Sequence, residues 1–125
     1  SNSVDYVRAD YSAIPVGTGV EFVRTAAFLS LDPDALDAPE REHVTLALYE
    51  TPGRFRVVEV KAPDAIARPE YRLTLDYTED YELMKRLFEA NNSPTTRDVI
   101  ALLEGQPEWA NLNAHCGQRL ARTED

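Results

Sequence analysis

The chain has 125 residues, enough for one compact domain, and its hydrophobic fraction of 43% supports a folded core. Its net charge of −9 repels a nucleic-acid backbone, which argues against nucleic-acid binding. The longest apolar runs are four or five residues, too short to cross a bilayer, and no signal-peptide pattern is present. The single cysteine, Cys116, excludes an internal disulfide, and we expect a cytoplasmic protein that does not bind membranes.

The first forty residues predict two strands and a short helix. Residues 4–9 alternate apolar and polar side chains, which is typical of a half-buried strand. A turn-rich stretch follows, and the apolar run at residues 20–23 predicts a second strand. Thr25 can begin a short helix, whereas residues 31–38, with three aspartates and a proline, predict a loop.

The middle of the chain predicts a longer helix followed by two strands. Asp37 with Glu40 three residues later is typical of a capping box, and the helix is expected to run to about Glu50. Its apolar positions are spaced by three and four residues, as on one face of a helix. Residues 55–60 and 71–75 are apolar runs bounded by turn residues, so each predicts a strand.

The last third of the chain predicts three helices. Residues 78–90 carry two acids in their first turn, which favours a helix N-terminus. The residues expected on the apolar face of this helix are Tyr81, Met84, Leu87 and Phe88. Thr95 begins a second helix that Gly105 ends, and Pro107 begins a third. The mixture of strands and helices indicates an α/β architecture.

Four polar residues of different chemistry lie within residues 41–45. One helical turn would hold a cation, a carboxylate, an imidazole and a hydroxyl, and Arg41 and Thr45 would share a face. Such a cluster can bind a polyhydroxylated or anionic ligand. The alternative is a solvated helix surface with local ion pairs.

An aspartate follows the strand expected at residues 71–75, and a helix begins two residues later. Ligands of open α/β sheets bind beyond the carboxyl ends of strands, so Asp76 could hold a magnesium ion that bridges phosphates. Alternatively, Asp76 caps the helix, with Glu79 at the third helical position. We interpret Asp80 as a structural acid that favours the helix N-terminus.

Two further groups are interpreted without a chemical role. Gly17 and Gly19 are typical of a tight turn, although glycines can also allow a ligand to approach closely. His115 and Cys116 are adjacent and are expected to point in different directions on a helix, which makes them a poor metal pair. Cys116 also lacks a patterned partner that would activate a nucleophile.

Taken in order, these segments resemble the spore-coat polysaccharide synthesis cytidylyltransferases. This group lies within the broader family of acylneuraminate and deoxy-manno-octulosonate cytidylyltransferases. The resemblance covers nearly the whole chain. The residues that carry it are Pro15, Gly17, Val20 and Glu21, then residues 41–45, then residues 73–80, and finally residues 112–115.

The resemblance implies a partial Rossmann-like α/β/α nucleotidyltransferase sandwich with a mixed sheet and C-terminal helices. It implies attack by a sugar hydroxyl on the α-phosphate of CTP, with Mg²⁺ as cofactor. The products would be pyrophosphate and a CMP-sugar for surface polysaccharide biosynthesis. Transferred to this sequence, the resemblance implies a metal ligand at Asp76, catalytic residues at Arg41, Glu42 and His43, and substrate-binding residues at Glu21 and Thr45.

The sequence departs from the family pattern in two respects. Gly19 stands where family members often have an aspartate. The basic, serine-containing nucleotide-binding loop of the family's N-terminal half is also absent. We therefore expect residues 1–125 to be the C-terminal portion of a cytidylyltransferase-like domain, inactive alone. Exposed sheet edges would make it self-associate, for example as a homodimer.

Two other functions stay open. The chain could be a non-enzymatic binding or assembly module that keeps the fold without catalysis, which the absent loop favours. It could also be a small metal-dependent hydrolase built on Glu42, His43 and Asp76. Neither the sugar nor the nucleotide can be chosen from these residues.

Overall fold

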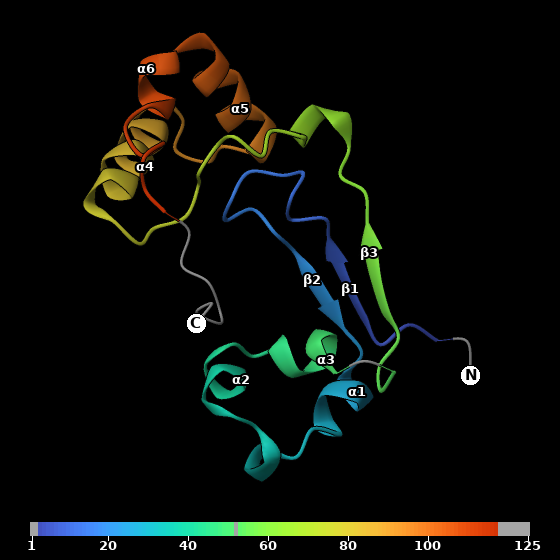
Figure 1. Cartoon of the computed structure of the whole chain (residues 1–125). Helices are drawn as coiled ribbons and strands as arrows, with labels where there is room; N and C mark the ends of the chain where they lie inside the picture. Colours follow the sequence, from blue (N-terminus) through green and yellow to red (C-terminus); the bar gives the residue numbers. More distant parts are fainter. Residues whose placement is uncertain (1–2, 52, 118–125) are drawn as a thin grey trace. The chain divides into compact units, whose positions relative to one another are not determined.

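The computed structural model describes residues 3–51 and 53–117 (Figure 1). They fall into two compact units. The first unit contains residues 3–8 and 20–60, and the second contains residues 9–19 and 61–117.

A three-stranded sheet forms the centre of the first unit. Its strands are β1 (Tyr6–Ala9), β2 (Glu21–Val23) and β3 (Val57–Val60), in the order β2-β1-β3. Strands β1 and β2 are antiparallel, with Tyr6 opposite Val23. The arrows of β1 and β3 point the same way in Figure 1, so the sheet is mixed, as the resemblance implies. These three strands confirm the predictions made for residues 4–9, 20–23 and 55–60.

Short helices complete the first unit. They are α1 (Thr25–Leu29), the 3-10 turn η1 (Pro33–Ala35), α2 (Ala38–Glu42) and α3 (Leu46–Glu50). The core between sheet and helices consists of Tyr6, Ala27 and Leu48. All three are at most 3% exposed, and Val23, Leu31, Tyr49 and Phe55 pack against them.

The single helix predicted from Asp37 to Glu50 is wrong. The capping box is present, since Asp37 accepts the Glu40 N–H and Glu40 accepts the Asp37 N–H. The helix nevertheless ends at Glu42, and His43 adopts an extended conformation. The break separates α2, which has no buried residue, from α3, in which Leu46, Ala47 and Leu48 are buried. Arg41 and Thr45 therefore do not share a helix face.

Three helices dominate the second unit. They are α4 (Thr78–Ala90), α5 (Thr96–Gly105) and α6 (Pro107–Ala110), and a 3-10 turn, η2 (Asp64–Ile66), contacts α5. Thr95 caps α5 as predicted. The core cluster of Leu83, Leu87, Val99 and Leu103 joins α4 to α5. The C-terminal helices implied by the resemblance are thus present.

Two details of the second unit differ from prediction. Of the apolar face expected on α4, only Leu87 is fully buried, while Tyr81 and Phe88 are more than half exposed. Residues 71–75 form no strand. They contribute one parallel bridge, between Arg72 and Val16, because the chain turns away at Gly17, whose φ is 94°. Among the described residues, no helix is long and apolar enough to span a membrane.

Candidate functional site

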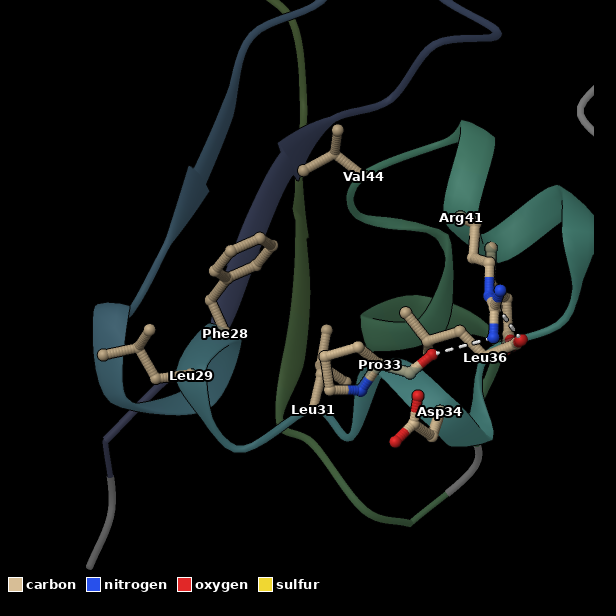
Figure 2. A pocket seen from close by; sticks show the side chains of 9 residues that line it. Phe28, Leu29, Leu31, Pro33, Asp34, Leu36, Arg41 and Val44 are labelled. Carbon is tan, nitrogen blue, oxygen red and sulfur yellow. Dashed lines mark hydrogen bonds between the residues drawn. The ribbon is translucent and has the colours of Figure 1, made fainter.

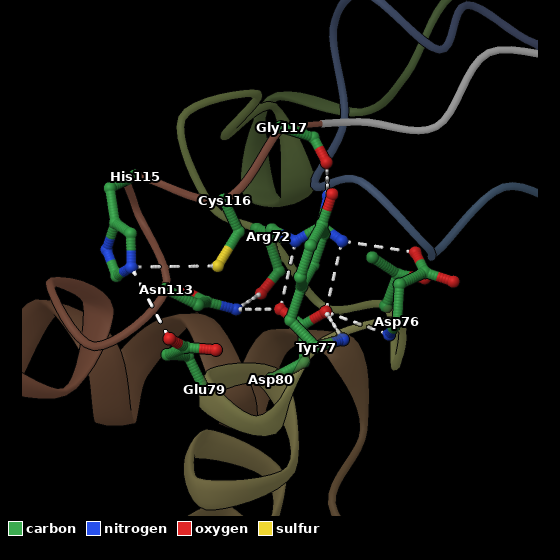
Figure 3. A network of polar contacts seen from close by, with 10 residues as sticks. Arg72, Asp76, Tyr77, Glu79, Asp80, Asn113, His115, Cys116 and Gly117 are labelled. Carbon is green, nitrogen blue, oxygen red and sulfur yellow. Dashed lines mark hydrogen bonds and ion pairs between the residues drawn. The ribbon is translucent and has the colours of Figure 1, made fainter.

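A buried ion pair lies at the start of α4 (Figure 3). The Arg72 guanidinium donates from Nε to Asp80 Oδ1 (2.9 Å) and from Nη2 to Asp80 Oδ2 (3.0 Å). The Arg72 side chain is 6% exposed and that of Asp80 is 0% exposed. This two-point contact between a planar guanidinium and a carboxylate is the strongest form of an arginine–carboxylate pair.

Asp80 also fixes the residues that precede α4. It accepts the backbone N–H of Asp76 (2.9 Å) and of Tyr77 (3.1 Å), and Asn113 donates to it from Nδ2 (2.7 Å). Burial alone would raise the pKa of Asp80, but the hydrogen bonds from Arg72, Asp76, Asn113 and Tyr77 together hold that pKa well below its usual range. Asp80 is therefore an ionised structural acid, as predicted.

The geometry corrects the capping scheme considered for Asp76 and Glu79. The N-cap of α4 is Tyr77, in an extended conformation, which makes Asp80 the third helical residue. Asp80 therefore takes the acceptor role that the alternative interpretation gave to Glu79. Asp76 lies just outside the helix and is not its cap.

The Asp76 carboxylate is held on one side only. Its Oδ2 accepts hydrogen bonds from Arg72 Nη2 (3.1 Å) and from Thr74 Oγ1 (3.1 Å). Within the part of the chain that the structure describes, no hydrogen bond reaches Oδ1, and 30% of the side chain is exposed. One carboxylate oxygen is thus fixed, and the other is open to a ligand.

This arrangement fits a magnesium ion that a bound phosphate helps to hold. Magnesium is usually bound by one or two carboxylates together with substrate phosphates and water, so a single open carboxylate suffices. Residues 3–51 and 53–117 contain no group of three His, Cys, Asp or Glu side chains that could hold a metal alone.

Two predicted substrate-binding residues of the first unit contact each other. Thr45 Oγ1, in the break between α2 and α3, donates to Glu21 Oε2 on β2 (2.8 Å). The hydroxyl of buried Tyr6 donates to Glu21 Oε1 (2.7 Å). Glu21 therefore joins strand β2 to the helix break, and both its carboxylate oxygens accept hydrogen bonds from the chain itself.

Arg41 lies beside a cavity of about 630 Å³ (Figure 2). The cavity is lined by Phe28, Leu29, Leu31, Pro33, Asp34, Leu36, Glu40, Arg41 and Val44. The Arg41 guanidinium donates from Nε to Leu36 O (3.1 Å) and from Nη2 to Pro33 O (3.2 Å). Through these two bonds, the guanidinium stabilises the loop that precedes α2.

The side chains of Glu42 and His43, unlike that of Arg41, are not held by hydrogen bonds to other described residues. Glu42 is the exposed last residue of α2, and the half-buried His43 follows it. No hydrogen bond or ion pair between described residues occupies either side chain. Of the residues predicted at 41–45, these two keep polar groups that could reach a ligand.

The two glycines of the predicted turn differ in what a side chain would meet: backbone atoms at Gly17, and the exposed side chain of Tyr11 at Gly19. A Cβ on Gly17 would lie 2.5 Å from Leu73 O, and one on Gly19 would lie 2.2 Å from the Tyr11 ring. Gly17 also has a positive φ, so the tight-turn interpretation is confirmed for Gly17. A side chain at position 19 would require the exposed Tyr11 side chain to move.

The expectation that His115 and Cys116 lie on a helix and point in different directions is wrong, whereas nothing contradicts their interpretation as a poor metal pair. Helix α6 ends at Ala110, so these residues are not helical, and His115 Nε2 lies 4.0 Å from Cys116 Sγ and 3.7 Å from Glu79 Oε1. Burial, with nearby Glu79 and Asp80, raises the pKa of the Cys116 thiol. A thiol that resists ionisation is a poor nucleophile, which agrees with the absence of a predicted role.

Sequence reasoning missed Arg72 and Asn113. Asn113 is 1% exposed and donates to Arg72 O (3.0 Å) as well as to Asp80. One signal was available for Arg72, since an arginine in an apolar run, four and eight residues before two aspartates, needs a buried acid as partner. Asn113 lies within the family motif at residues 112–115, but its contact spans more than thirty residues of sequence and has no local signature.

Comparison with solved structures defines the class of fold. The chain matches a cytidylyltransferase from Leptospira borgpetersenii serovar Hardjo-bovis with a TM-score of 0.67 and 22% identity. The match covers 94% of this chain and 48% of that structure. The chain therefore has the α/β nucleotidyltransferase fold that the motifs implied. No family model matches the sequence.

Comparison with curated sequences identifies particular relatives. The spore coat polysaccharide biosynthesis protein SpsF of Bacillus subtilis is 35% identical over 109 residues, which are 82% of this chain and 45% of that protein. An uncharacterized protein of Methanocaldococcus jannaschii is 30% identical over 124 residues, 97% of this chain and 50% of the relative. The chain spans about half the length of these relatives. The resemblance is confirmed at this level: the chain is similar in sequence to SpsF over most of its length, and its fold is that of a cytidylyltransferase.

Proposed function

We propose that this chain forms part of a sugar cytidylyltransferase for surface polysaccharide biosynthesis. The observation that carries the proposal is the open Oδ1 of Asp76, in a chain with a cytidylyltransferase fold. The sugar hydroxyl oxygen forms a bond to the α-phosphorus of CTP, the bond from that phosphorus to the pyrophosphate oxygen breaks, and the hydroxyl proton leaves. The products are a CMP-sugar and pyrophosphate.

Asp76 is the residue that would hold Mg²⁺. When bound, magnesium neutralises phosphate charge and orients the attack. The network around Arg72 supports this role because the positive charge of the guanidinium is paired with Asp80, which leaves the negative charge of Asp76 for a cation. An exposed acid without such support would bind a cation in many orientations.

His43 and Glu42 are the proposed sugar-side catalytic residues. His43 would accept the proton of the attacking hydroxyl, and Glu42 would hold sugar hydroxyl groups. Among the polar residues predicted at 41–45, these two have side chains without hydrogen bonds to described residues, which supports this choice. Three other predicted site residues hydrogen-bond to groups of the chain itself: Arg41, Glu21 and Thr45. We propose that they maintain the local structure of this region.

The test is pyrophosphate release by the product of the whole reading frame that encodes this chain. With CTP, Mg²⁺ and a panel of sugars, we expect release with at least one sugar. Asp76→Asn and His43→Ala should each lower kcat/KM about 10²-fold or more, whereas Glu89→Gln should not. Release that is unchanged in Asp76→Asn would contradict the proposal. The 125-residue chain alone should release none, because it lacks the basic nucleotide-binding loop.

A binding module without catalysis is the second candidate. It is favoured by the self-satisfied polar groups of Glu21, Arg41 and Thr45, three of the residues predicted to meet the substrate. This alternative predicts that the product of the whole reading frame binds a sugar or nucleotide but releases no pyrophosphate under any combination of substrates. The same assay, combined with a binding titration, separates the two functions.

A further inference from the structure

Asp76 is held by two routes that both start at Asp80. The first is through the backbone, because the Asp76 N–H donates to Asp80 Oδ2 at 2.9 Å. The second is through a side chain, because Arg72 Nη2 donates both to Asp80 Oδ2 (3.0 Å) and to Asp76 Oδ2 (3.1 Å). A single guanidinium nitrogen therefore joins a buried carboxylate to a partly exposed one (Figure 3).

Asp80 is itself fixed by the rest of the network. Both its oxygens accept from Arg72, and the Asn113 amide donates to Oδ1 at 2.7 Å. Asn113 also donates to Arg72 O (3.0 Å), so both amide hydrogens are used and the amide cannot be turned over. Arg72 donates in addition from Nη1 to Gly117 O (3.3 Å). These contacts tie the segment after α6 to the start of α4.

The charges of this network are unequal. Arg72 carries one positive charge, and Asp76 and Asp80 carry two negative charges between them. The two-point contact assigns the arginine to Asp80, which is fully buried and could not stay ionised without a partner. One negative charge is left over, and it lies on the carboxylate whose Oδ1 faces away from these hydrogen bonds.

We propose that Arg72, Asp80 and Asn113 form a positioning network that fixes the Asp76 carboxylate in one orientation and leaves its negative charge available to a divalent cation. This inference rests on the proposed function, since the cation is the one that the reaction requires. Arg72 is a positioning residue and does not contact the substrate. The network also explains why a buried ion pair lies at a helix start where a simple cap would suffice.

The test is nuclear magnetic resonance of the isotopically labelled 125-residue chain. Asp76 should show a single χ1 rotamer in its coupling constants, and the amides of Asp76 and Tyr77 should exchange slowly with solvent. Averaged χ1 couplings for Asp76 in the unsubstituted chain would overturn the inference, whatever the behaviour of any variant.

The variant that separates positioning from charge is Arg72→Lys. Lysine keeps the positive charge beside Asp80, but one ammonium cannot reproduce the fork that reaches both carboxylates. Asp76 should then average between rotamers while the spectrum stays that of a folded protein. The matched control is Arg68→Lys, which alters an exposed pair with Glu104 in the same unit and should leave Asp76 unchanged. A folded Arg72→Lys protein with a single Asp76 rotamer would overturn the inference.

Titration with Mn²⁺ then distinguishes this inference from the proposed function. Paramagnetic broadening at Asp76 should need roughly tenfold more Mn²⁺ in Arg72→Lys, the usual effect of losing a partner that orients a metal ligand. Broadening that is equal in the two proteins would overturn the positioning role. If Asp76 is ordered by Arg72 but Mn²⁺ never broadens it, the orientation of Asp76 by Arg72 stands, whereas the availability of its charge to a cation fails, and the metal role of Asp76 in the proposed function fails with it.

Discussion

Asp80 and Asp98 occupy the same position, the third residue of α4 and of α5, yet their surroundings differ completely. Each accepts the backbone N–H of the residue that caps its helix. Asp98 is exposed and, among the described residues, has only Thr95 as a side-chain partner, whereas Asp80 is fully buried and pairs with Arg72. An aspartate at the third helical position can therefore contribute differently to stability, depending on which groups the tertiary structure places beside it.

The comparison gives a direct stability test. Asp80→Asn should lower the free energy of unfolding by about 3–5 kcal/mol, because it removes the fully buried carboxylate charge that pairs with the buried Arg72 guanidinium. Asp98→Asn should have a much smaller effect, since water replaces the lost interactions. Urea unfolding followed by circular dichroism measures both, and equal losses would contradict the assignment of Asp80 as the buried anchor.

Asp80 should also determine how stability depends on pH. Its pKa in the folded chain is below the unfolded value of about 3.9, so its contribution is complete above that value and is lost as the pH falls. The free energy of unfolding should therefore decrease more steeply below about pH 5 in the unsubstituted chain than in Asp80→Asn. Parallel curves from pH 6 to pH 3 would show that Asp80 is not ionised at a depressed pKa.

At the scale of elements, local signals located the helices better than their ends or faces. The acids in the first turn of α4 and the Thr95 cap of α5 could be identified from sequence because capping uses neighbouring residues. The break at His43, which separates α2 from the buried residues of α3, could not. The Arg72–Asp80 pair was missed because an arginine among apolar residues indicates a buried acid but does not identify it, and only the tertiary structure shows that the acid is Asp80.

Gly17 offers a test of the turn that ends the pairing with Arg72. Its φ of 94° is a backbone conformation that residues with a side chain rarely adopt. In addition, Leu73 O lies 2.5 Å from the position of a Cβ at residue 17. Gly53 has a φ of 77° but open space around it, so Gly53→Ala carries only the cost of the backbone conformation, about 1–2 kcal/mol. Gly17→Ala should be clearly more destabilising in urea unfolding. An equal effect would mean that the contact with Leu73 is readily relaxed.

At the scale of the whole molecule, the motifs predicted the class of fold although they occupy only parts of the chain. The order of the motifs carried that information, and the match to the cytidylyltransferase from Leptospira confirmed it. Residue roles were harder to predict, because a motif gives no hydrogen-bond partners. Arg41, Glu21 and Thr45 were expected to meet substrate, and in the structure they bind groups of the chain itself.

Self-association remains a prediction at this scale. Strand β2 ends the described order of strands in its sheet, and Phe22 on it is 70% exposed. We expect light scattering at high concentration to give a mass above that of the monomer, and Phe22→Ser should reduce it. Tyr81→Ser, which removes an exposed aromatic residue from α4, is the control. A monomer at all concentrations would contradict the expectation.

The most direct test of the central claim is calorimetric titration of CTP into the product of the whole reading frame, with and without Mg²⁺. We predict that Mg²⁺ strengthens CTP binding and that Asp76→Asn removes this dependence, whereas the exposed-acid control Glu89→Gln preserves it. CTP binding that depends equally on Mg²⁺ in the unsubstituted protein and in Asp76→Asn would contradict the assignment of Asp76 as the magnesium ligand.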